Sequence, residues 1–200
     1  MNDNYLEDNI ALLERIFSLA YEYKYSLTAL EKNISNSFYF QKIERDDYIS
    51  PIIIDISLAK DVLPELNVDL DNVPVYKQCL WAAESYLRIQ KETHFTFELI
   101  FLYIPISKMY EYFKIFHEMD FSQIIKEFNR LYLEKSVFNL LINYYQLKLK
   151  LISEITNISY STLLSLNNRR RDIKKMNVED VSKLARLFRV RVETISEIRI

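Results

Sequence analysis

The fold is decided by residues 147–195, which read LKLKLISEITNISYSTLLSLNNRRRDIKKMNVEDVSKLARLFRVRVETI. The helical apolar pattern of this stretch stops at Asn157, and asparagine is the non-glycine residue that best tolerates a left-handed turn. Ser159 follows as a good N-cap. These signals predict three helices, at about residues 150–156, 160–167 and 179–188. Two short helices around a tight turn are typical of a helix-turn-helix, whose second helix is free on one side to enter a DNA major groove.

The same stretch resembles the lambda-repressor/Cro (XRE-type) helix-turn-helix family over roughly residues 137–197. The turn Asn157-Ile158-Ser159 stands where the family has Gly-Val-Ser. Other positions of the family pattern are occupied by Ile152, Ser153, Thr162, Leu163, Leu166, Leu184, Ala185, Leu187 and Val190. The resemblance implies a five-helix DNA-binding domain at the C-terminus.

The resemblance also implies which residues touch DNA. The family has a phosphate-contacting Gln at the start of its second helix, and Lys148, Leu149 and Lys150 stand there in this chain. Basic residues after the recognition helix are then expected to contact phosphates, which gives affinity without sequence information. The predicted DNA-binding residues are Ser159, Tyr160, Ser161, Ser165, Asn168, Arg169, Arg170, Arg171, Lys174 and Lys175. Base contacts are expected from Tyr160, Ser161 and Ser165.

Charge is distributed unevenly along the chain, whose formal net charge is −2. Residues 144–200 hold 12 Lys and Arg against 6 Asp and Glu, whereas residues 1–71 hold 6 against 14. Residues 72–143 carry 8 of each sign. A basic block in an acidic chain favours a polyanionic partner for that end of the molecule. The alternative is a solvated basic surface, or one that docks on the acidic N-terminal block.

Glycine is absent from all 200 residues. Its absence excludes the glycine-rich phosphate loops of P-loop and dinucleotide-binding proteins and the GxSxG nucleophile elbow. It also removes the residue that left-handed helix caps prefer, so we expect a chain that avoids positive φ and consists of helices and polar connections. With one cysteine and two histidines, the sequence offers no structural zinc site of the usual Cys/His kind. No cofactor or metal is expected.

The rest of the chain also shows helical patterns, and the predicted fold class is all-α, a helical bundle core followed by the C-terminal domain. The predicted segments are a helical domain at 1–71, a core or dimerisation unit at 72–133 and the helix-turn-helix domain at 134–200. The polar stretch Asn67–Val73 is the candidate linker. Residues 48–56 are ambiguous because their isoleucines favour a strand, and residues 95–103 fit either a buried helix or a strand.

A second, degenerate helix-turn-helix is one interpretation of the N-terminal segment. Residues 33–37, NISNS, repeat the NISYS of residues 157–161, and Ile43-Glu44-Arg45-Asp46 resembles the end of the family's recognition helix. The fourth helix of this copy would contain Leu58, Ala59 and Leu63. We expect the break between its short helices at Ile34-Ser35. Because the segment is acidic, such a copy would serve packing, dimerisation or partner binding and would not bind DNA.

Candidate catalytic groups are few. Arg88 and His94 have the Arg-to-His spacing of HEPN-type ribonucleases, which are all-helical, and this makes a ribonuclease the second alternative function. His117 is expected as a partly buried helix residue. Cys79 is expected in the core, without a neighbouring histidine or helix N-terminus to lower the pKa of its thiol. No set of nucleophile, base and orienting group follows from the spacing, so we expect a protein that is not an enzyme.

The sequence predicts a DNA-binding transcriptional regulator that acts through the C-terminal helix-turn-helix. A homodimer on duplex DNA is expected because one recognition helix reads only a half-site. The first alternative is a protein-interaction module, such as an antitoxin or a phage or mobile-element inhibitor, that uses the acidic N-terminal region. The N-terminus lacks a signal-peptide pattern and the longest apolar run, Phe95–Ile106, is too short to span a bilayer, so a cytoplasmic protein without membrane contact is expected. Abundant Lys, Ile, Asn and Tyr suggest an AT-rich bacterial, plasmid or phage genome.

Overall fold

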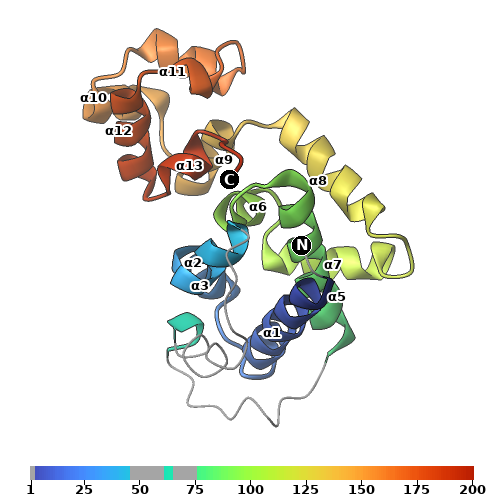
Figure 1. Ribbon diagram of the computed structural model, residues 1–200. Helices are drawn as coiled ribbons and strands as arrows, with labels where there is room; N and C mark the ends of the chain where they lie inside the picture. Colours follow the sequence, from blue (N-terminus) through green and yellow to red (C-terminus); the bar gives the residue numbers. More distant parts are fainter. Residues whose placement is uncertain (1–2, 46–60, 65–75) are drawn as a thin grey trace.

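The computed structural model describes residues 3–45, 61–64 and 76–200. Every regular element in these ranges is a helix, which confirms the predicted all-α class (Figure 1). The N-terminal and central helices are α1 (Asp3–Glu22), α2 (Leu27–Asn36), α3 (Phe38–Glu44), α5 (Lys77–Thr93), α6 (Phe97–Tyr103), α7 (Ile106–Phe116) and α8 (Ser122–Glu134). The C-terminal helices are α9 (Val137–Tyr145), α10 (Leu149–Thr156), α11 (Tyr160–Asn167), the 3₁₀ helix η2 (Ile173–Lys175), α12 (Val178–Phe188) and α13 (Val192–Ile195). Across the described ranges, no helix combines the length and the apolar character needed to cross a bilayer.

Helix α5 lies at the centre of the fold and contacts α1, α6, α7 and α8. Its neighbour α1 carries Leu13 and Phe17, both fully buried. The Phe17 ring meets Tyr86 of α5 and Tyr110 of α7 edge-on, with ring centroids 5.9 and 6.5 Å away. Such edge-to-face pairs stabilise the core beyond the free energy gained by burying apolar area.

The segment 95–103, whose sequence fits either a strand or a buried helix, contains the buried helix α6. The Thr96 hydroxyl caps this helix by accepting a hydrogen bond from the Leu99 N–H at 3.2 Å. Most of α6 is buried because it is surrounded by α2, α5, α8 and α9. The other ambiguous segment, 48–56, lies outside the described residues, as do the candidate linker 67–73 and the Leu58-Ala59 pair.

The apolar core crosses the predicted segment boundaries. Buried apolar residues form one contiguous cluster that extends from α1 to α13. Helix α1 packs on α5 across the boundary at residue 71, and α6 contacts α9 and α13 across the boundary at residue 133. The three segments predicted from the sequence therefore share one core in the part of the chain that the structure describes.

A buried ionic cluster of Glu44, Glu98, Arg191 and Thr194 fastens the C-terminal helices to the rest of the molecule. Glu44 is 1% exposed and accepts hydrogen bonds from the Arg191 guanidinium at 2.7 and 2.8 Å. It also accepts from the Phe97 N–H at 2.6 Å. Glu98 accepts from the Thr194 hydroxyl at 2.6 Å and from the Arg191 N–H at 3.0 Å. The cluster holds the start of α13 against α3 and α6 by pairing its buried charges, although the Arg191 Nε–H lies 3.7 Å from Glu98 and forms no hydrogen bond.

Although the chain has no glycine, several of its residues adopt left-handed backbone conformations. The non-glycine residues with positive φ in the described ranges are Lys24, His94, Gln146, Asn157, Arg169, Arg189 and Glu197. Four of them are the C-caps of α5, α9, α10 and α12. The expectation of a chain that avoids positive φ is wrong, because these four helix ends use a left-handed residue to turn N–H groups back to the last carbonyls even without glycine. Each such residue costs roughly 1–2 kcal/mol.

Glu31 of α2 gives the stability of this fold a predictable pH dependence. Its carboxylate accepts the Ile106 N–H at the start of α7 at 2.6 Å. Burial raises the pKa of Glu31 from 4.5 to about 7, and the hydrogen bond from Ile106 only partly opposes this. The folded state therefore binds this proton more tightly than the unfolded chain, and stability falls as the pH rises from about 4.5 to about 7.

Replacing Glu31 with Gln is expected to remove that part of the pH dependence, because the amide cannot ionise but still offers an oxygen to Ile106. Urea midpoints measured between pH 4.5 and pH 8 would give a flatter profile for E31Q than for the unmodified chain. E92Q, at an exposed position, is the matched control and should leave the profile unchanged. Equal slopes for E31Q and the unmodified chain would show that Glu31 is not the titrating group.

Candidate nucleic-acid interface

The turn between α10 and α11 forms at the residues that the sequence indicates. Asn157 is left-handed, with φ 56° and ψ 23°, and its N–H returns to the Ser153 carbonyl. The Ser153 hydroxyl donates to the Ile158 carbonyl at 2.6 Å. Ser159 is extended and its side chain accepts the Thr162 N–H at 3.2 Å, which starts α11. The predicted cap and the predicted helix at 160–167 are therefore confirmed.

Helix α11 has one buried side and one uncovered side. Leu163 and Leu166 are buried and face the neighbouring helices α9 and α10. Figure 1 shows α10 and α11 at the far end of the molecule from α1. The uncovered side consists of Tyr160, Ser161, Leu164, Ser165 and Asn168. No other described segment blocks the approach of a large ligand to this face.

Two apolar side chains dominate that uncovered side. Tyr160 is 50% exposed and Leu164, one helical turn later, is 39% exposed. The sequence analysis named Tyr160 but missed Leu164. The i, i+4 spacing could have shown that Leu164 shares the exposed face with Tyr160 once Leu163 and Leu166 are assigned to the core.

The serine hydroxyls of α11 and of its N-cap form local hydrogen bonds. Ser159 donates to the Thr162 hydroxyl at 2.8 Å, and Ser165 donates to the Ser161 carbonyl at 2.8 Å. The hydroxyls of Ser159 and Ser161 lie 3.1 Å apart and share a further bond. Ser159 therefore works as the helix cap. Ser161 and Ser165 would have to give up a local bond to donate to a base, but their oxygens can still accept a hydrogen bond from one.

A basic loop follows α11. Its side chains Arg170, Arg171, Lys174 and Lys175 are exposed. No ion pair joins any of them to an acidic residue in the described ranges, whereas Lys183 of α12 pairs with Glu179 at 2.8 Å. The loop also contains one carboxylate, Asp172, so it is a net positive patch next to the uncovered side of α11.

Arg169 has an internal role, and this changes its assignment. Its guanidinium donates to the carbonyls of Tyr132, Leu133 and Lys135 at the C-terminal end of α8. It also lies over the Tyr132 ring, 5.9 Å from the centroid. The guanidinium thus satisfies helix-end carbonyls that have no partner within the helix. We therefore assign Arg169 to holding α11 against α8 and remove it from the set of phosphate contacts.

The N-terminal copy of the helix-turn-helix does not form in the predicted register. Asn33, Ile34 and Ser35 lie inside α2, where the Ser35 hydroxyl donates to the Glu31 carbonyl at 2.7 Å. The helices α2 and α3 instead meet at Ser37, which caps α3 through the Tyr39 N–H. Glu44, predicted at the end of a surface helix, is buried in the ionic cluster with Arg191. The predicted break at Ile34-Ser35 is therefore wrong.

The residues considered for catalysis are held in separate local contacts. Arg88 pairs with Glu84 at 2.6 Å and stacks on Phe121, while His94 caps the end of α5, and no interaction joins Arg88 to His94. Cys79 is buried, and burial raises the pKa of its thiol. Within the described ranges, no group of three or more His, Cys, Asp or Glu side chains is close enough to hold a metal ion.

The C-terminal helices thus combine a short helix that is uncovered on one side with a net positive loop. Comparison with protein-family models, curated proteins and solved structures finds no match to this chain. The function is therefore inferred from the geometry and charge of this interface.

Proposed function

We propose that this protein binds duplex DNA through α11 and regulates transcription. The observation that supports the proposal is the pairing of α11, uncovered along one side, with four exposed cations in the loop that follows it. The uncovered helix has the size and position to enter a major groove, which admits one α-helix. The loop supplies the phosphate contacts that fix such a helix on the duplex.

The two sides of this interface have different tasks. Arg170, Arg171, Lys174 and Lys175 provide affinity for any sequence, because they neutralise phosphates and release counterions. Lys148 and Lys150, both exposed at the start of α10, add positive charge at the opposite end of the helix pair. Sequence preference comes from the uncovered side of α11, where Tyr160 and Leu164 are the most prominent side chains.

Selection from a random duplex pool tests this function. We expect enrichment of a consensus with two inverted half-sites about 10 base pairs apart, because the regulator is proposed to act as a homodimer that places two α11 helices in successive grooves. Sequencing of the bound fraction measures the consensus, and light scattering measures the oligomer. Failure to retain any duplex at low salt would reject DNA binding and favour the acidic N-terminal region as a protein-binding surface.

The exposed apolar side chains on the uncovered side of α11 predict that DNA binding depends on thymine methyl groups. Tyr160 and Leu164 can contact the C5-methyl of thymine in the major groove, and deoxyuridine lacks this methyl while keeping the same hydrogen-bonding edge. Replacing thymine with deoxyuridine in the selected site is expected to weaken binding about fourfold for each contacted methyl. Competition binding with matched thymine and uracil duplexes measures the ratio.

The variant L164A provides the matched control for this dependence. Leu164 is exposed, so its truncation leaves the core of the C-terminal helices intact. L164A should bind the thymine and uracil duplexes more equally than the unmodified protein. If L164A keeps the same ratio of affinities for the thymine and uracil duplexes, Leu164 does not contact a thymine methyl group.

A further inference from the structure

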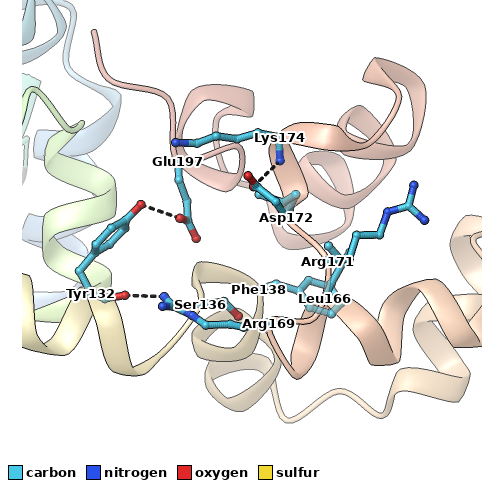
Figure 2. Close-up of a pocket in the computed structure, with 10 residues that line it drawn as sticks. Tyr132, Ser136, Phe138, Leu166, Arg169, Arg171, Asp172, Lys174 and Glu197 are labelled. Carbon is cyan, nitrogen blue, oxygen red and sulfur yellow. Dashed lines mark hydrogen bonds between the residues drawn. The ribbon is translucent and has the colours of Figure 1, made fainter.

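A pocket lies behind α11, between the loop that follows this helix, the junction of α8 with α9 and the C-terminal tail (Figure 2). Its volume is about 260 Å³. Its charged lining residues are Arg169, Arg171, Asp172, Lys174 and Glu197. Figure 2 shows Arg171 directed away from the other polar side chains, so the pocket's own cations are Arg169 and Lys174.

The two carboxylates of the pocket are already engaged by the protein. Glu197 accepts the Tyr132 hydroxyl at 2.8 Å and the Val137 N–H at 3.2 Å. Asp172 accepts the Lys174 N–H at 3.0 Å and thereby caps η2. Each carboxylate therefore already serves a group of the chain, Glu197 with two hydrogen bonds and Asp172 with one.

Several donors of the pocket are also unused. Lys174 carries an ammonium group that forms no hydrogen bond or ion pair with any described residue, and its side chain reaches across the pocket in Figure 2. Arg169 uses three donors on carbonyls out of the five that a guanidinium offers. The Ser136 hydroxyl accepts from the Asn139 N–H at 3.1 Å and still has its own hydrogen to donate. The Lys174 ammonium is the charged group of the pocket that has no partner among the described residues, and its natural partner is an anion.

We propose that this pocket binds a small organic monocarboxylate. A single negative charge fits best, because Asp172 and Glu197 repel a phosphate dianion more strongly than a monoanion. The cation available to the ligand is Lys174, since Arg169 is bound to the carbonyls of α8 and Arg171 is directed away. The buried side chains Phe138 and Leu166 form an apolar floor that favours a ligand with a compact hydrocarbon body. The volume lies just below the range of roughly 300–1,000 Å³ that drug-sized ligands fill, so the ligand is small.

The pocket shares Lys174 with the DNA-contacting loop, and this second part of the inference rests on the proposed function. A carboxylate paired with Lys174 neutralises one of the cations that contact phosphates. The carboxylate therefore lowers the affinity for DNA, and by linkage DNA lowers the affinity for the carboxylate to the same extent. Leu166 of α11 forms part of the pocket floor, so the pocket directly contacts the helix that is proposed to enter the major groove.

Calorimetric titration of the full chain without DNA tests the pocket, with sodium benzoate and sodium isovalerate as probes. We expect saturable binding of at least one probe in the millimolar range. Benzyl alcohol and inorganic phosphate should bind much more weakly, because one lacks the charge and the other carries too much. Absence of saturable binding by both carboxylates, or tighter binding of phosphate, would overturn the proposal.

The matched variants are K174M and K175M, and each removes one exposed cation of the loop. Lys174 lines the pocket, whereas Lys175 does not. K174M is expected to weaken carboxylate binding about tenfold through loss of one charge-assisted hydrogen bond, and K175M is expected to leave it unchanged. Equal effects of the two variants would show general charge attraction and not a site. Because this measurement contains no DNA, its failure leaves the DNA-binding function standing. Failure of duplex binding leaves the pocket standing and removes only the link between them.

Discussion

Replacing Arg170, Arg171, Lys174 and Lys175 together with alanine is expected to lower the affinity for duplex DNA by about two to three orders of magnitude at physiological salt. These side chains are exposed and form no ion pairs in the described ranges, so the folded structure does not depend on them. Each lost phosphate contact should also reduce the slope of log K against log salt by about 0.9, or by as much as about 3.6 for all four. Fluorescence anisotropy with a labelled duplex over a salt series measures both quantities.

A variant with the same change in net charge separates local contacts from general attraction. Lys77, Lys91, Lys114 and Lys126 are exposed on α5, α7 and α8, away from the loop after α11. Their replacement by alanine removes the same charge but should leave the salt slope nearly unchanged, because exposed charges beyond a Debye length of about 8 Å are largely screened. If the two quadruple variants bind DNA equally, the basic loop is not the phosphate-contacting element.

Arg169 provides a further comparison with this loop. Its guanidinium is bound to the carbonyl end of α8, so R169A is expected to destabilise the attachment of α11 and not merely to remove one phosphate contact. The sequence alone could not separate Arg169 from its two neighbours, because the carbonyls that it binds lie 34 to 37 residues earlier in the chain. Contacts over that separation leave no local signal.

Local signals explain why the helix pair α10 and α11 could be predicted well. The left-handed Asn157 and the Ser159 cap are chosen by interactions within a few residues, so the sequence determines the turn and the bounds of α11 directly. The same reasoning failed at Asn33-Ile34-Ser35. There the identical three letters lie inside α2, because the cap that starts the next helix is Ser37. The letters Asn-Ile-Ser therefore mark a turn only where their serine is also the N-cap of the next helix, as Ser159 is and Ser35 is not.

The non-local parts of the structure were beyond the sequence analysis for a physical reason. The pocket behind α11 is formed by residues from α8, α9, the loop after α11 and the C-terminal tail, which meet only in the folded chain. The ionic cluster is similar, since Glu44 and Arg191 are separated by 147 residues. Neither the unpaired ammonium of Lys174 nor the buried carboxylate of Glu44 differs in sequence from an ordinary surface charge.

Replacing Arg191 with methionine is expected to destabilise the protein by about 3–5 kcal/mol, the second large effect that the structure predicts. The substitution leaves the buried Glu44 and the nearby Glu98 without their cation, although Glu44 keeps the Phe97 N–H. An uncompensated buried carboxylate costs far more than the packing that methionine restores. Urea unfolding followed by circular dichroism measures the free energy of unfolding. R186M, at an exposed arginine of α12, serves as the control and should change it little.

The double variant E44Q/R191M distinguishes the charge effect from a packing effect. E44Q removes the carboxylate charge that R191M leaves without a cation, and it keeps an oxygen for the Phe97 N–H. The double variant is therefore expected to be more stable than R191M alone. Such a rescue would show a coupling between the two residues, which a double-mutant cycle measures directly. If E44Q and R191M simply add, or if R191M is no less stable than R186M, then the ionic cluster does not hold α13 against α3 and α6. The C-terminal helices would in that case be attached mainly by the apolar contacts of α6 with α9 and α13.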